Sequence, residues 1–215
     1  MIIVLGGDKG GTGKSHLAAN MAVCLIKQGK KVALMGSDLN RSIKDWLIRR
    51  NELNLTPIAF KEAYGDLRKE IIKQAPLTDI LIVDTAGNDN SELRTAIPVA
   101  NILITPIDPF SQMEADTLPK LTKIVREGQK INPKLIPYVL FYRCLPNTFK
   151  EQNDLRLSLE SHEFWINPLK NTISHLRIFV KAINEGKGVH EMNSKISGTG
   201  KAKAQIELFI NEIGL

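Results

Sequence analysis

The sequence of 215 residues predicts an α/β fold, with a mostly parallel, twisted sheet flanked by helices on both faces. Short continuous apolar runs, typical of strands buried on both faces, alternate with segments of helical periodicity. A glycine-rich loop joins the first of these strands directly to the first helix. No internal repeat and no Gly-, Ser- or Pro-rich linker divides the chain, so we expect one domain over residues 1–215.

The first half of the chain contains three of these apolar runs. Residues 2–5, 32–35 and 80–83 are predicted as buried strands. Residues 15–28 carry apolar side chains at positions 17, 21 and 25 and at 18, 22 and 26, which is helical spacing, and Gly29 is a suitable C-cap. A second helix is expected over residues 41–49.

The second half continues the same alternation. Residues 102–104 and 135–141 are predicted as further strands. Helices are expected over residues 112–127, 173–184 and 201–213. Because parallel strands need a crossover connection, these helices are expected to cover both faces of the sheet.

The composition is that of an ordinary soluble globule, with 43% hydrophobic and 24% charged residues. Cys24 and Cys144 lie far apart and match no metal-ligand spacing, so both are expected to be reduced. No apolar run approaches the roughly 18 residues that span a bilayer. Met1 leads straight into an apolar strand with no basic leader, so we expect a cytoplasmic protein.

The positive charge is concentrated in the last third of the chain. Residues 168–205 contain seven basic side chains against two acids, so this stretch carries +5 of the formal net charge of +6. Such a patch predicts a polyanionic partner, although a solvated charged surface is the alternative interpretation. The candidate contact residues are Lys170, Arg177, Lys181, Lys187, Lys195, Lys201 and Lys203.

Residues 9–15, K-G-G-T-G-K-S, have the composition and position of a phosphate-binding loop. Glycines let backbone N–H groups approach an anion, and the helix N-terminus adds its positive dipole. Lys14 is expected against the β- and γ-phosphates, and the Ser15 hydroxyl against Mg²⁺. The assigned nucleotide contacts are Gly10, Gly11, Thr12, Gly13, Lys14, Ser15 and His16.

The loop departs from the common P-loop pattern at its first position. Asp8 replaces the usual glycine, and the loop instead fits K-G-G-x-G-K-[ST], with an additional lysine, Lys9, at its start. A chance glycine loop with a solvated Lys9 is the alternative interpretation. Asp84 ends the apolar strand 80–83 and is expected to support Mg²⁺, unless it is a simple turn residue.

Four blocks of sequence resemble the ParA/MinD family of deviant Walker-A P-loop ATPases, and most closely the small plasmid-partition ParA proteins. They are residues 9–15, V-A-L-M-G-S-D-L-N at 32–40, D-I-L-I-V-D-T-A-G at 79–87 and A-I-N-E-G-K-G-V-H-E at 182–191. The segment 100–109 adds a weaker similarity. This resemblance implies ATP hydrolysis with ATP and Mg²⁺ as cofactors. An Asn-Lys-x-Asp pattern for guanine is absent.

The resemblance also implies roles for individual residues. Lys9 would reach across a dimer interface to the partner's nucleotide, acting with Lys14 as a catalytic cation. Asp38 would orient the attacking water, although it could instead cap the helix that follows. Gly36 stands where relatives carry an additional aspartate, and Leu39-Asn40 where they carry Pro-Gln. Arg143, at the end of the last strand, would contact adenine.

The function implied is positioning of plasmid or chromosomal DNA by a homodimer that forms with ATP and binds DNA without sequence preference. A centromere-binding, ParB-like partner would stimulate hydrolysis, and the protein would be associated with the nucleoid. Because the phosphate loop begins at residue 9, no N-terminal helix-turn-helix is expected.

Four other functions stay open from the sequence. One is a MinD-like membrane switch, which the acidic flanks of the apolar stripe 206–213 disfavour. A nitrogenase-type iron protein is disfavoured by the position of Cys24 on the first helix. A small-molecule kinase would give Lys9 no role in a dimer. The fourth is positioning of a cargo other than DNA.

Overall fold

The chain forms a seven-stranded sheet whose recorded strand pairs are all parallel, with the order β3-β2-β4-β1-β5-β6-β7. The computed structural model describes residues 1–7, 9–37, 42–87 and 91–215. The strands are β1 (Ile2–Leu5), β2 (Val32–Gly36), β3 (Ala59–Glu62), β4 (Ile80–Asp84), β5 (Ile102–Ile107), β6 (Ile136–Cys144) and β7 (Ile173–Ser174). The predicted α/β class is confirmed.

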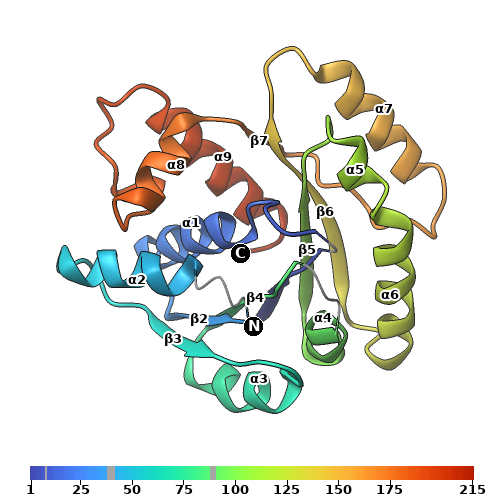
Figure 1. Ribbon diagram of the computed structural model, residues 1–215, viewed down its shortest axis with the longest axis horizontal. Helices are drawn as coiled ribbons and strands as arrows, with labels where there is room; N and C mark the ends of the chain where they lie inside the picture. Colours follow the sequence, from blue (N-terminus) through green and yellow to red (C-terminus); the bar gives the residue numbers. More distant parts are fainter. Residues whose placement is uncertain (8, 38–41, 88–90) are drawn as a thin grey trace.

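Helices cover both faces of this sheet (Figure 1). The α-helices are α1 (Lys14–Lys27), α2 (Ser42–Glu52), α3 (Arg68–Gln74), α4 (Ser91–Ala96), α5 (Gln112–Ala115), α6 (Leu118–Ile131), α7 (Phe149–Glu160), α8 (Arg177–Asn184) and α9 (Thr199–Glu212). Short 3₁₀ helices are η1 (Ala75–Leu77), η2 (Ile97–Val99) and η3 (Val189–Glu191). No helix in the described part of the chain is long and apolar enough to cross a membrane.

Two hydrophobic clusters lie on opposite faces of the sheet, because neighbouring strand residues point to opposite sides. In β1, Ile3 and Leu5 join the cluster beneath α1, α2, α8 and α9, while Val4 joins the cluster beneath α3, α4, α6 and α7. Burial on both faces explains why β1, β4 and β5 read as continuous apolar runs. This arrangement leaves the carboxyl ends of the strands free to carry a site.

The structure corrects two predicted helices. The helix expected over 173–184 begins only at Arg177, because Ile173 and Ser174 form β7 beside β6. The helix expected over 112–127 is divided into α5 and α6, with Pro119 in the first turn of α6. Proline lacks the N–H that would continue α5 through this point.

Candidate nucleotide-binding site

The phosphate loop connects β1 to α1 at the carboxyl edge of the sheet. Gly13 has φ of 89°, and a Cβ there would lie 2.5 Å from Cε1 of Tyr142. Glycine is therefore required both by backbone conformation and by space. Lys14 is only 6% exposed, and its Nζ donates a hydrogen bond to the carbonyl of Lys9 at 3.1 Å. The loop thus curls around its own lysine.

The predicted metal-site pair is in direct contact. The Ser15 hydroxyl donates a hydrogen bond to Oδ2 of Asp84 at 2.6 Å, and Asp84 is 2% exposed. Asp84 stands at the end of β4, between Leu5 of β1 and Gly36 of β2 in the sheet register. A hydroxyl hydrogen-bonded to a buried carboxylate is the donor set with which P-loop proteins hold Mg²⁺. These two residues therefore fit a magnesium ion.

The segment after β4 lies directly against the phosphate loop. The Thr85 hydroxyl donates to the carbonyl of Leu5 at 2.9 Å, and the Ala86 N–H donates to Oγ of Ser37 at 3.1 Å. At Gly87 an added Cβ would lie 2.4 Å from the Lys9 carbonyl oxygen and 2.6 Å from the Gly10 nitrogen. The ends of β2 and β4 are in this way fixed to the loop.

The assigned nucleotide contacts surround one cavity of about 260 Å³. Its lining consists of Gly10, Gly11, Thr12, Gly13, Lys14, Ser15, His16, Ser42, Thr85, Gly87 and Arg143. The Thr12 hydroxyl is buried there without a hydrogen-bond partner among the described residues, as expected of a group that awaits a ligand. This volume lies near the lower end of the range of about 300–1,000 Å³ that is usual for small-molecule sites.

Of the two other predicted catalytic residues, the structure describes Lys9 but not Asp38. Lys9 is half-buried, and no described residue accepts a hydrogen bond or forms an ion pair with its ammonium. Asp38 lies outside the described residues, as do Asp8, Leu39 and Asn40. Their predicted roles therefore stay predictions.

Gly36 has a local explanation in the packing of the neighbouring strand. A Cβ at Gly36 would lie 3.2 Å from two ring carbons of Phe60 on β3. The aromatic ring thus occupies the space into which the family's additional aspartate would project. Lys44 and Glu62 form an ion pair of 2.7 Å, and both line the small pocket that Gly36, Phe60 and Asp84 also line.

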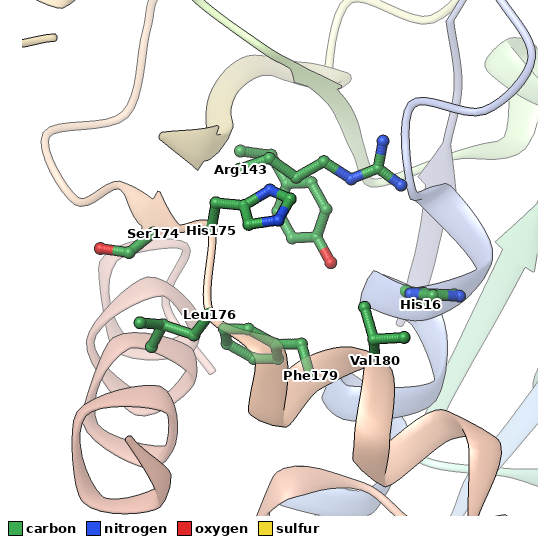
Figure 2. Close-up of a pocket in the computed structure, with 8 residues that line it drawn as sticks. His16, Arg143, Ser174, His175, Leu176, Phe179 and Val180 are labelled. Carbon is green, nitrogen blue, oxygen red and sulfur yellow. The ribbon is translucent and has the colours of Figure 1, made fainter. Parts of the chain in front are cut away.

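Arg143 lies beside the phosphate loop, in a pocket adjoining the cavity. It has φ of 62°, and its Nη1 donates to the Gly11 carbonyl at 2.7 Å. Figure 2 shows that His175, from the segment after β7, lies beside Arg143, with His16 and Val180 across the pocket. Burial, and then the charge of Arg143, lower the pKa of His16, which keeps its imidazole neutral near pH 7.

Sequence reasoning identified Arg143 but missed the opposite wall of this pocket. The missed residues line a small space of about 30 Å³ together with Tyr142 and Arg143, and they are Ser174, His175, Leu176, Phe179 and Val180. Ser174 ends β7, Phe179 and Val180 lie on α8, and His175 and Leu176 connect the two, whereas the sequence predicts one continuous helix over 173–184. The signal that could have revealed them is their position just after an edge strand, because ligands bind outside the carboxyl ends of parallel strands.

The seven basic residues of the C-terminal third differ in their surroundings. Arg177 and Lys181, one turn apart on α8, line the same open groove. Lys187 is 3.0 Å from Glu185, and Lys203 donates to the carbonyl of Met192 at 3.3 Å. The remaining three, Lys170, Lys195 and Lys201, are exposed.

Relatives of the chain are found by sequence. It is 25% identical over 212 residues to Protein ParA of Rhizobium radiobacter, covering 97% of this chain and 93% of that protein. It is 29% identical over 160 residues to an uncharacterized ATP-binding protein of Methanocaldococcus jannaschii. That match covers 60% of this chain and 61% of that protein, so the chain spans about three fifths of this relative.

Solved structures share the fold. A plasmid partition protein of Borrelia burgdorferi superposes with a TM-score of 0.64 at 16% identity, covering 98% of each chain. The septum site-determining protein MinD of Pyrococcus horikoshii, complexed with Mg-ADP, has a TM-score of 0.67 at 16% identity, covering 99% of this chain and 96% of that one. The predicted cofactors, ATP and Mg²⁺, are thereby confirmed at the level of this fold family.

Sequence and fold thus lead to the same family. The CobQ/CobB/MinD/ParA nucleotide binding domain matches residues 3–189, which include the phosphate loop, β4 with Asp84, and the small pocket beside Arg143. The predicted family and the predicted P-loop ATPase are confirmed, with partition or positioning as the general role. The chain belongs to the CobQ/CobB/MinD/ParA family of nucleotide-binding domains and is a P-loop ATPase of the ParA/MinD type.

Proposed function

We propose that this chain positions plasmid or chromosomal DNA by forming an ATP-bound homodimer that holds DNA without sequence preference. A centromere-binding, ParB-like protein would stimulate hydrolysis and release the DNA. The protein would accordingly be cytoplasmic and associated with the nucleoid. The relative named Protein ParA, matched over 97% of this chain, supports the partition role.

The residues around the cavity have distinct roles in this proposal. Backbone N–H groups of the loop and the Lys14 ammonium hold the phosphates, and Lys14 keeps its position through the Lys9 carbonyl. Ser15 and Asp84 would hold Mg²⁺, which neutralises charge on the phosphate oxygens when bound. Asp38 would orient the attacking water. Arg143, which lines the phosphate cavity, would contact the base.

Lys9 is proposed to complete the site of a second protomer. Within its own chain its ammonium has no partner among the described residues, and Lys9 is not among the residues that line the cavity, although it directly precedes Gly10, which does. A cation supplied by a partner stabilises charge on the transferring phosphoryl group and can be worth about 10³–10⁵ in rate. Hydrolysis would therefore require dimerisation.

The observation that carries DNA binding is the position of the basic groove on α8. The groove, of about 460 Å³, is lined by Arg177 and Lys181 and also by Glu185, whose carboxylate lies 4.0 Å from the Lys181 ammonium. His175 and Val180 line both this groove and the small pocket beside Arg143, so the groove and the pocket share a wall. A nucleotide that moves this wall would change the groove, which provides a route for ATP to gate DNA binding.

The membrane alternative requires an apolar face on the C-terminal helix that is available to lipid. In the structure, Ile206, Phe209 and Ile210 of α9 are fully buried in the cluster beneath α1. The stripe over 206–213 is thus used for packing within the chain. This observation favours DNA over membrane as the surface that is bound, and positioning of a non-DNA cargo is the second candidate.

The proposal is tested by retention of the protein on non-specific duplex DNA with ATP and with ADP. We expect retention with ATP only, and its loss in Arg177→Ala/Lys181→Ala, whose ATPase rate without DNA should be unchanged. The matched control is Lys69→Ala on α3, an exposed lysine of a helix that packs on the opposite face of the sheet. Equal retention with both nucleotides would disprove gating, and equal retention by the double variant would disprove this groove.

A further inference from the structure

The chain contains a buried ion pair far from the nucleotide cavity. Nη1 and Nη2 of Arg50, in the last turn of α2, lie 2.7 and 2.8 Å from Oε2 and Oε1 of Glu191. The two side chains are 0% and 7% exposed, whereas each other ion pair recorded between described residues has a partner that is 34% or more exposed. Such a pair contributes little net stability and is better suited to fixing one arrangement of its elements.

Further contacts hold the Arg50 side chain and attach α2 to residues 186–191, which we call the bridge segment. Nε of Arg50 donates to the Thr56 carbonyl at 2.8 Å, and its guanidinium lies 5.5 Å from the ring centre of Trp46. The indole N–H of Trp46 donates to the carbonyl of Lys187 at 3.1 Å. Two neighbouring turns of α2 are therefore attached to the bridge segment.

The surroundings of Glu191 favour the ionised form of its carboxyl group, which is the form that pairs with Arg50. Burial alone would raise the pKa of its carboxyl, but hydrogen bonds from Arg50 and from the Gly188 N–H, with the charge of Arg50, lower the pKa overall. Glu191 is thus held ionised, and its carboxylate links α2 to the backbone of the bridge segment.

The bridge segment is attached to α1 on its other side. The N–H of Val189 donates to Oδ1 of Asn20 at 2.9 Å, and Nδ2 of Asn20 donates to the His16 carbonyl at 2.7 Å. Asn20 is fully buried. A Cβ at Gly188 would lie 2.6 Å from Val23, which places the segment directly against α1.

These contacts connect two walls of the nucleotide cavity. His16 in the first turn of α1 and Ser42 at the start of α2 both line that cavity. Ser42 stands eight residues before Arg50, about 12 Å along the helix axis. A continuous path of hydrogen bonds and rigid helix therefore runs from one wall through Asn20, the bridge segment and Arg50 to the other.

We infer that the bridge segment sets the spacing of α1 and α2, and that Asn20, Arg50 and Glu191 are positioning residues for ATP hydrolysis. The residues between β2 and α2 include Asp38, and their C-terminal anchor is α2. Displacement of α2 would therefore change the spacing of the two cavity walls, and with it the segment in which the sequence predicts the residue that orients the attacking water. The inference rests on ATP hydrolysis and is independent of the proposed DNA binding.

The test compares Asn20→Ala, Arg50→Lys and Glu191→Gln with the wild type. We expect kcat to fall about 10- to 100-fold, because a misplacement near 1 Å has effects of this size. The Kd for a fluorescent ADP analogue should change less than about threefold, because the phosphate loop itself is intact. Glu207→Gln is the matched control, since this acid contacts His190, next to Glu191, but nothing on α2.

Two further variants separate positioning from plain stability. In Arg50→Met/Glu191→Met the urea midpoint should return to the wild-type value, because apolar replacement of a whole buried pair is often neutral. Its kcat should nevertheless stay low, since methionines fix the spacing less strictly. In Asn20→Ala/Glu191→Gln the loss of kcat should be no larger than in the more affected single variant, because both changes interrupt one path.

Three results would overturn the inference. One is a wild-type kcat in the folded single variants. Another is recovery of kcat together with stability in the double methionine variant. The third is a fold-loss of kcat in Asn20→Ala/Glu191→Gln that equals the product of the losses in the two single variants. This third result also decides the question if the double methionine variant does not fold.

Discussion

Gly87 lies outside the phosphate loop but packs against it, and its replacement by alanine should displace the loop and lower ATPase activity. The new Cβ would lie 2.4 Å from the Lys9 carbonyl oxygen and 2.6 Å from the Gly10 nitrogen, whereas ordinary contact begins at 3.4 Å. Both neighbours are backbone atoms, so either the loop or the segment after β4 must move by about 1 Å. The Lys9 carbonyl is the acceptor for Lys14 Nζ, and its movement would release the phosphate-binding lysine.

The expected size follows from two effects. Overpacking of this kind costs about 1–3 kcal/mol of unfolding free energy. A displacement near 1 Å at reacting groups costs about 10²-fold in rate. In Gly87→Ala the midpoint of urea unfolding and the steady-state rate of phosphate release should therefore both decrease.

The matched control is Gly7→Ala, in the same loop, where the new Cβ would meet only Thr105 Cγ2 at 3.9 Å. This variant should keep wild-type stability, because the contact is ordinary. Wild-type turnover and stability in Gly87→Ala would refute the close approach. Equal damage in both variants would mean that the loop tolerates no change at all.

The other predictions concern charge. Lys9→Ala should lower turnover by about 10³-fold or more while nucleotide affinity stays unchanged, and wild-type specific activity should rise with protein concentration. An activity that is independent of concentration would instead indicate a monomeric enzyme. The logarithm of DNA affinity should fall linearly with the logarithm of salt concentration, with a slope of about −0.9 per phosphate contacted. Arg177→Ala and Lys181→Ala should each reduce that slope by about 1. Because the pKa of Glu191 is lowered on folding, its stabilisation is present above its ordinary pKa of 4.5 and is lost as pH falls below it. Urea titrations between pH 3 and pH 6 should show a smaller acid dependence in Glu191→Gln.

The parts of the fold predicted from sequence are those with a local signature. β1, β4 and β5 are buried on both faces, so their sequences are continuously apolar. β3 is an edge strand with a partly exposed, polar sequence, and β7 has only two residues. Neither carries a periodicity that distinguishes it from a loop or from the helix beside it.

The functional residues were likewise predictable only where they belong to a local sequence pattern. Lys14, Ser15 and Asp84 were predicted because loop and strand end each have a recognisable pattern, and the sheet register brings them together. The Arg50–Glu191 pair joins residues 141 positions apart, and a single arginine and a single glutamate have no such pattern. The C-terminal block of sequence that resembled the family proves to contain the bridge segment.

The central claim is that Lys9 of one protomer completes the site of another, and mixing two inactive variants tests it most directly. Lys9→Ala keeps Lys14 for its own nucleotide but supplies no cation, whereas Lys14→Ala supplies Lys9 but has a damaged loop. In a mixed dimer, one site would combine an intact loop with the partner's Lys9. The claim predicts ATPase activity in the mixture well above the sum of the two separate proteins, and an activity equal to that sum at every ratio would contradict it.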